Sequence, residues 1–153
     1  MSIAAYTIRT GRVSLGKDNS FEVRALTFPD LALMVTNHMP SLVAILSKYQ
    51  EARGDVFTRQ NVAQLAVMVS RDFPNLATEI ISACVHGETV DDQTRQKISM
   101  FPAPVAMAAL VEIARISVEE AGGLGNLIAD FRQRIQDAMA AEGTSDPSPI
   151  PNE

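Results

Sequence analysis

Residues 98–131 read ISMFPAPVAMAALVEIARISVEEAGGLGNLIADF, and this stretch decides the fold class of the chain. Pro102 and Pro104 fix φ and disfavour helix in the residue before each of them, so a helix can begin only at about Pro104. Apolar residues then recur at steps of three, four and one, which predicts a helix with a wide apolar side. These residues are Val105, Ala108, Ala109, Leu110, Ile113 and Ile116.

The second half of this stretch predicts another helix. Ser117 and Glu120 have the spacing of a capping box, so we expect a new helix to start at Ser117. The glycines at 122, 123 and 125 interrupt it, and the apolar pattern then restarts at Leu124 and continues to Met139. Little in the stretch could perform chemistry, and its pattern favours packing and binding over catalysis.

Composition limits what kind of protein this is. The 153 residues fit one domain, and 46% apolar content without tryptophan indicates a core of Ala, Val, Leu, Ile and Met. A single cysteine, Cys84, excludes an internal disulfide and fits a reducing compartment. Neither a membrane-spanning run nor a signal-peptide pattern is present in the sequence. We therefore expect a soluble cytoplasmic protein that does not bind a membrane.

The charge distribution argues against nucleic acid as a partner. The formal net charge is −5, and three of these negative charges lie in the last twelve residues, on Glu142, Asp146 and Glu153. The body therefore carries only −2, and it lacks the clustered Lys and Arg that phosphate binding needs.

The rest of the chain predicts a hairpin followed by helices. Alternating apolar residues on both sides of the Gly16–Ser20 loop predict a β-hairpin over about residues 6–26. Thr27 suits the N-cap of a first helix, which Pro40 should kink or end near His38. Further helices are expected over about 59–72, 74–85 and 89–99. The prediction is a mainly α protein: a bundle of about five to seven helices with an N-terminal hairpin in one domain, 1–141, and a disordered tail, 142–153.

No pattern in the sequence predicts a catalytic, cofactor or metal site. Cys84 and His86 are two residues apart, which on a helix points them to different sides. The glycines at 122–125 lack the Lys-Ser/Thr of a phosphate-binding loop. We therefore expect a protein that is not an enzyme.

Four segments, taken in order, resemble a known family. They are FEVRALTFPDL at 21–31, FPNLA with EII at 73–81, FPAPV at 101–105, and residues 116–127. Together they are similar to the tail assembly chaperones, or pre-tape-measure proteins, of long-tailed phages and prophages. The resemblance implies a chaperone in the host cytoplasm that binds the tape measure protein and keeps it soluble before tail-tube polymerisation, and that is absent from the mature virion.

The resemblance also implies further partners and leaves an alternative open. A frameshifted longer form of the same protein and the tail tube protein are the implied further partners, and an oligomer is compatible with the family. The alternative is a minor structural component of the phage tail or of the head-tail junction, to which the hairpin would add a strand. A DNA-associated helical protein is a weaker third reading.

A chaperone of this kind needs an adaptable apolar groove. Methionine suits such a groove because its flexible side chain repacks against many sequences. The alternative for each methionine is that it fills a gap in an aromatic-poor core. The candidate partner-binding residues, which lie near helix ends and proline breaks, are Met34, Met39, Met100, Phe101 and Met107.

Overall fold

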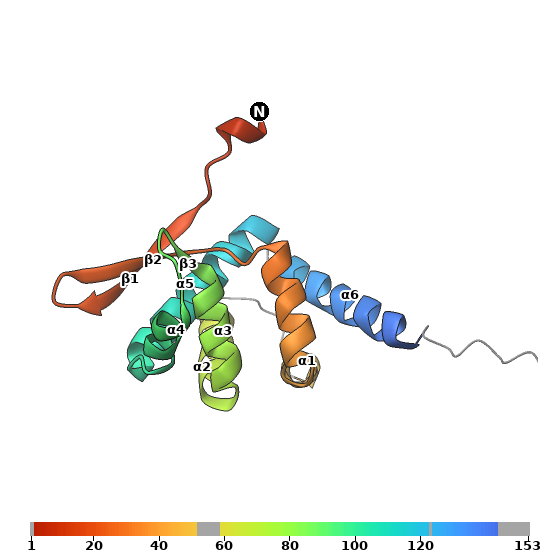
Figure 1. The fold of residues 1–153 in the computed structure, drawn as a ribbon. Coiled ribbons are helices and arrows are strands. Elements are labelled where there is room, and N and C mark those ends of the chain that lie inside the picture. The colour runs from red at the N-terminus through yellow and green to blue at the C-terminus, as the bar shows by residue number, and fades with distance from the viewer. Residues whose placement is uncertain (1, 52–58, 123, 144–153) are drawn as a thin grey trace, which may run out of the picture.

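The computed structural model describes residues 2–51, 59–122 and 124–143. A short 3-10 helix, Ile3–Ala5, precedes strands β1 (Thr10–Gly16) and β2 (Asn19–Arg24) (Figure 1). Six α-helices and one further strand follow: α1 (Phe28–Glu51), α2 (Arg59–Asp72), α3 (Pro74–Cys84), β3 (Val85–His86), α4 (Asp92–Ser99), α5 (Ala103–Ala121) and α6 (Leu124–Gly143). The prediction of a mainly α fold with an N-terminal hairpin is confirmed.

The hairpin forms the sheet because its residues alternate between two faces. β1 and β2 pair antiparallel with Val13 opposite Phe21, and the turn has positive φ at Gly16, Lys17 and Asp18. Val13 and Val23 are buried on the face that packs against α5. The tight turn has a steric cost at Lys17, since non-glycine residues rarely adopt positive φ.

The third strand was not predicted. Val85 pairs with Val23 and His86 pairs with Glu22, so β3 lies on the far side of β2 from β1. The sequence predicted that Val85 belongs to the helix over about 74–85, but that helix, α3, ends at Cys84. Two residues are too few to show the alternation of apolar and polar side chains that predicts a strand. This strand forms because the end of α3 places Val85 beside the unpaired edge of β2.

Helix α5 is the centre of the molecule. It packs against the hairpin, α2, α3 and α6, while α1 packs against α3 and α6 (Figure 1). Its buried apolar residues recur along one side, as the sequence predicts, and are Ala109, Leu110, Ile113 and Ile116. Ala108, which the same pattern included, is exposed.

The capping box predicted at Ser117 is wrong. α5 continues through Ser117 and Glu120 and ends at Gly122, which adopts the left-handed conformation typical of a helix C-cap. Ser117 is buried, and its hydroxyl accepts a hydrogen bond from the backbone N–H of Leu26 at 3.0 Å. The glycine break was therefore correctly placed, but the serine serves a tertiary contact instead of a helix start.

The proline in α1 acts as predicted. His38 has φ −132° and ψ 30°, which are not helical values, so α1 bends at the residue two before Pro40. The predicted helix over 59–72 coincides with α2, and Asp91 caps α4 by accepting a hydrogen bond from the Thr94 N–H at 2.8 Å. α6 runs to Gly143, so residues 142 and 143, which were expected to begin the disordered tail 142–153, are helical instead. The rest of the expected tail, from residue 144 onward, lies outside the described residues.

Candidate functional site

Four of the five candidate partner-binding residues fall into two groups on either side of α3. Met34 and Met39 lie on α1, while Met100 and Phe101 lie between α4 and α5 (Figure 1). α3 packs against both α1 and α4. Met107, the fifth, lies on α5 and is partly buried. The structure therefore distributes the candidates over α1, the α4–α5 connection and α5.

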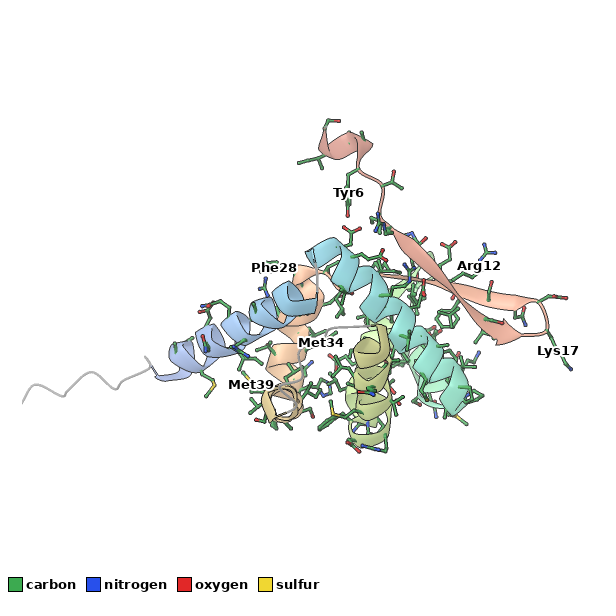
Figure 2. All side chains as sticks on the ribbon, turned by 180° about the vertical axis from the view of Figure 1, so that it is seen from behind. Tyr6, Arg12, Lys17, Phe28, Met34 and Met39 are labelled. Carbon is green, nitrogen blue, oxygen red and sulfur yellow. The ribbon has the colours of Figure 1, made fainter. Side chains whose placement is uncertain are left out.

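The α1 methionines belong to the interior of the protein. Met34 has only 1% of its side chain exposed, and Met39 is partly buried against the same core (Figure 2). In this conformation a partner cannot contact Met34.

Met100 and Phe101 have different surroundings although they are neighbours. Met100 is 76% exposed at the end of α4. Phe101 packs on Phe21 of β2, with ring centroids 5.6 Å apart and planes tilted by 41°. Such an aromatic pair stabilises the contact between the hairpin and the α4–α5 connection. Met100 is therefore available to a partner, while Phe101 mainly supports packing.

A buried polar contact fixes the bend of α1 against α3. The Glu79 carboxylate on α3 contacts Nε2 of His38 and accepts a hydrogen bond from Nδ2 of Asn37 at 3.4 Å. Arg95 of α4 lies 3.8 Å from the same carboxylate. The side chains of His38 and Glu79 are only 16% and 9% exposed. One carboxylate thus joins α1, α3 and α4.

The N-terminal arm, residues 2–9, carries exposed apolar side chains that the sequence did not single out. Ile3 is 94% exposed, and Tyr6 and Ile8 are also exposed. Three polar contacts hold the base of the arm to the end of α5. Arg9 pairs with Glu119 at 2.9 Å and with Glu120 at 3.6 Å. The Tyr6 hydroxyl lies 3.5 Å from the Glu120 carboxylate (Figure 2). The period-two spacing of Tyr6 and Ile8 was the available signal, but it was assigned to the hairpin.

A second exposed aromatic side chain lies where α1 meets α6. Phe28 is 68% exposed, and the guanidinium of Arg134 lies over its ring at 3.1 Å from the centroid (Figure 2). Cation–π attraction of this kind holds an aromatic ring at a surface without burying it. Sequence analysis assigned Phe28 only to the start of a helix, because a stacking partner 106 residues away leaves no local signal.

Arg24 fastens the hairpin to the helices. Its guanidinium donates to Asp30 of α1 at 2.6 Å and to the carbonyl of Ala83 in α3 at 2.5 Å. Burial by itself would raise the pKa of Asp30, but the hydrogen bonds from Arg24 and Thr27 outweigh it and hold this pKa below its ordinary value. The pair therefore stays ionised and positions β2 against α1 and α3.

Cys84 and His86, the two residues that the sequence offers for metal or nucleophilic chemistry, both lie in positions with a structural role. Cys84 is fully buried, and burial raises the pKa of its thiol to about 12, so the thiol is protonated at neutral pH. His86 lies in β3. Over residues 2–51, 59–122 and 124–143, no group of three or more His, Cys, Asp or Glu side chains could hold a metal ion.

No single helix in the described part of the chain is long and apolar enough to cross a membrane. The sharply bent pair α4 and α5 is long and apolar enough only when the two helices are counted together, and this statement rests on length and composition alone.

The fold and these surfaces define a mainly helical protein whose N-terminal hairpin is fastened to a central helix and whose arm and helix ends expose apolar side chains. A family model described as Pre-tape measure protein matches residues 1–149, so the chain belongs to the pre-tape measure protein family. The resemblance recognised in the sequence is thereby confirmed, and it gives the protein a role in phage tail assembly. No curated protein and no solved structure matches the chain at a significant level.

Proposed function

We propose that this protein is a tail assembly chaperone that binds the tape measure protein and keeps it soluble before the tail tube polymerises. The family match over residues 1–149 is the observation that carries the proposal. A tape measure protein is a very long helical chain with apolar stretches, and such stretches aggregate while nothing covers them. A chaperone that covers them transiently needs no catalytic residue, acts in the host cytoplasm and leaves before the virion is complete.

Exposed apolar side chains support this proposal. Ile3, Phe28 and Met100 are each more than two-thirds exposed, at the arm, at the start of α1 and after α4. Exposed apolar side chains mark protein–protein contact surfaces when they gather, as Ile3, Tyr6 and Ile8 do within the arm. Several separate anchor points suit a long client, since each can hold a different stretch of it. The frameshifted longer form and the tail tube protein are the further partners that we propose.

Co-expression tests the proposal directly. The tape measure protein of the same phage is expressed alone and together with this protein, and its soluble fraction after centrifugation is measured. We expect the soluble fraction to rise on co-expression and the two proteins to co-purify. An unchanged soluble fraction with no co-purification would contradict the chaperone function.

One structural observation favours a second function. β1 is an edge strand of the sheet, so it could add to a strand of another protein in a permanent assembly. A minor component of the tail or of the head-tail junction would use it in this way. Mass spectrometry of purified virions separates the two functions: a structural component is recovered in stoichiometric amount, whereas a chaperone is absent.

A further inference from the structure

We propose that the position occupied by the second half of α1, residues 39–51, is a binding site for an apolar helical segment, and that the contact of Glu79 with the bend of α1 keeps this site closed. The inference deepens the proposed function, and it rests on that function only for the identity of the natural ligand, an apolar helical stretch of the tape measure protein. The site itself is argued from this chain alone.

The first observation is that α1 consists of two halves joined at a break. His38 has non-helical φ and ψ, and Pro40 lacks the N–H that would continue the hydrogen-bond ladder. The proline ring also clashes with the carbonyl of the residue four before it, Thr36, in a regular helix. The backbone between residues 36 and 40 therefore acts as a hinge, and the angle between the two halves must be fixed by side chains.

The second observation is that one buried carboxylate supplies this fixation. Glu79 contacts the side chains of both His38 and Asn37, which are the residues at the break. Its carboxylate is nearly excluded from solvent, and a buried carboxylate is costly unless it is paired and hydrogen-bonded. Arg95 supports the same carboxylate from α4. Because Glu79 contacts the side chains of the hinge residues themselves, these contacts hold the backbone of the break in its present conformation and so favour the closed angle.

The third observation defines what the site accepts. Leu42 is buried in the core, and Met39 and Ile45 are packed against it in partly buried positions. Their spacing of three residues places them on one side of the helix. The second half of α1 therefore packs one apolar side into the core. A ligand that displaces it must offer apolar side chains at the same helical spacing, which is how amphipathic helices bind in grooves.

Closure of the site by residues 39–51 lowers its apparent affinity for a helical ligand. A site that is open for only a fraction of the time binds with an apparent dissociation constant raised by the reciprocal of that fraction. The closed state protects Met34, Met39 and Leu42 from non-specific contact until a client competes. Loosening the Glu79 contact increases the open fraction, and so it should increase both the opening of residues 39–51 and the affinity for a helical ligand.

Hydrogen exchange tests the opening. We compare the wild-type protein with Glu79→Gln, which keeps the shape of the side chain, and with the matched control Glu119→Gln, whose carboxylate is exposed on α5. Exchange of the amides in residues 41–51 should become roughly tenfold faster in Glu79→Gln, the effect of losing one buried charged hydrogen bond. α5 should be unchanged in Glu79→Gln, and Glu119→Gln should leave residues 41–51 unchanged. His38→Gln should reproduce the effect, and the two substitutions together should not be additive.

A peptide tests the binding site without the tape measure protein. A fluorescent peptide copying residues 39–51, MPSLVAILSKYQE, should bind Glu79→Gln roughly tenfold more tightly than it binds the wild type or Glu119→Gln, in proportion to the open fraction. Equal binding to all three proteins, or exchange that rises equally in every helix, overturns the inference. If the peptide binds and the tape measure protein does not compete, the site stands and the proposed function fails. If the tape measure protein is captured without any peptide binding to Glu79→Gln, this site is wrong and the proposed function stands.

Discussion

The hydroxyl of Ser117 on α5 accepts a hydrogen bond from the backbone N–H of Leu26, with 3.0 Å between Oγ and N. Leu26 lies between β2 and α1, so this bond ties the hairpin exit to the central helix. Ser117→Ala leaves the N–H without this partner, and we expect the free energy of unfolding to fall by about 1–3 kcal/mol. Urea denaturation measures it. Ser70→Ala removes an exposed hydroxyl bond on α2 and should change stability by less; equal losses in the two variants would contradict the role of Ser117.

Ser117 also shows why part of the fold could not be predicted. The proline at position 40 and the glycine at 122 act through their own backbone geometry, so the bend in α1 and the end of α5 were predictable. The capping box at Ser117 was a local pattern as well, but a tertiary hydrogen bond from Leu26 uses the serine hydroxyl instead. Local sequence signals predict helix breaks well. The role of a polar residue inside an apolar stripe depends on which residues pack against it.

The environment of the candidate binding residues could be predicted only in part, for the same reason. Sequence position placed Met34, Met39 and Met100 near breaks, and the structure has a break at His38, next to Met39, and the end of α4 at Met100. Burial was not predictable, because Met34 faces the core while Met100 is exposed, and only the assembled helices decide this. The contacts of Glu79 with His38 and of Arg134 with Phe28 join residues far apart in the chain, so no spacing in the sequence indicates them.

Acid should weaken the Arg24–Asp30 pair. Asp30 has its pKa lowered below 3.8 in the folded state, so its contribution to stability is complete above 3.8 and is lost as the pH falls through the folded pKa. Asp30→Asn should lower the free energy of unfolding at neutral pH by about 2 kcal/mol, and it should lose less stability than the wild type in acid. Urea denaturation from neutral pH to below 3.8 measures both effects. Arg24→Gln should reduce the acid-dependent loss in the same direction, and parallel pH profiles for wild type and Asp30→Asn would contradict the assignment.

Gly11 is required by the close approach of β1 to α5. A Cβ at this position would overlap the side chain of Glu112, which pairs with Arg115 at 2.5 Å. Gly11→Ala forces Glu112 to rotate away from Arg115, and since the pair is partly exposed we expect a loss of only about 0.5–1 kcal/mol in the free energy of unfolding. In a Glu112→Ala background the same change should cost nothing measurable. Thermal denaturation of the four proteins gives the coupling, and additive effects would show that Glu112 is not the obstacle.

Substitution of Met34 should reduce stability, whereas substitution of Met100 should reduce binding of the client. Met34→Ala leaves a cavity in the core and should reduce the free energy of unfolding by about 2–5 kcal/mol. Met100→Ser changes an exposed side chain and should stay within about 0.5 kcal/mol of the wild type. We expect Met100→Ser to reduce co-purification of the tape measure protein in spite of its normal stability. Unchanged co-purification in both Met100→Ser and the double variant with Met107→Ser would count against these methionines as binding residues.

The N-terminal arm should matter for binding and not for folding. Its ion pair with the body, Arg9 to Glu119, joins side chains that are about half exposed, and such pairs contribute little to stability. The triple substitution of Ile3, Tyr6 and Ile8 by serine should therefore leave the free energy of unfolding within about 0.5 kcal/mol. The soluble fraction of co-expressed tape measure protein should fall, because three exposed apolar side chains are removed from the same segment.

A second triple variant makes the arm prediction specific. Leu15, Leu33 and Val67 are exposed apolar residues on β1, α1 and α2, so their joint substitution by serine removes three apolar side chains from outside the arm. If apolar surface in general captured the client, both triple variants would lower its soluble fraction equally, and the arm would have no special role. A loss confined to the arm variant assigns capture to residues 2–9. Because the arm lies beside the end of α5, apart from the position of residues 39–51, each can hold a different stretch of the client, and combining the arm variant with Glu79→Gln should change client binding and hydrogen exchange independently.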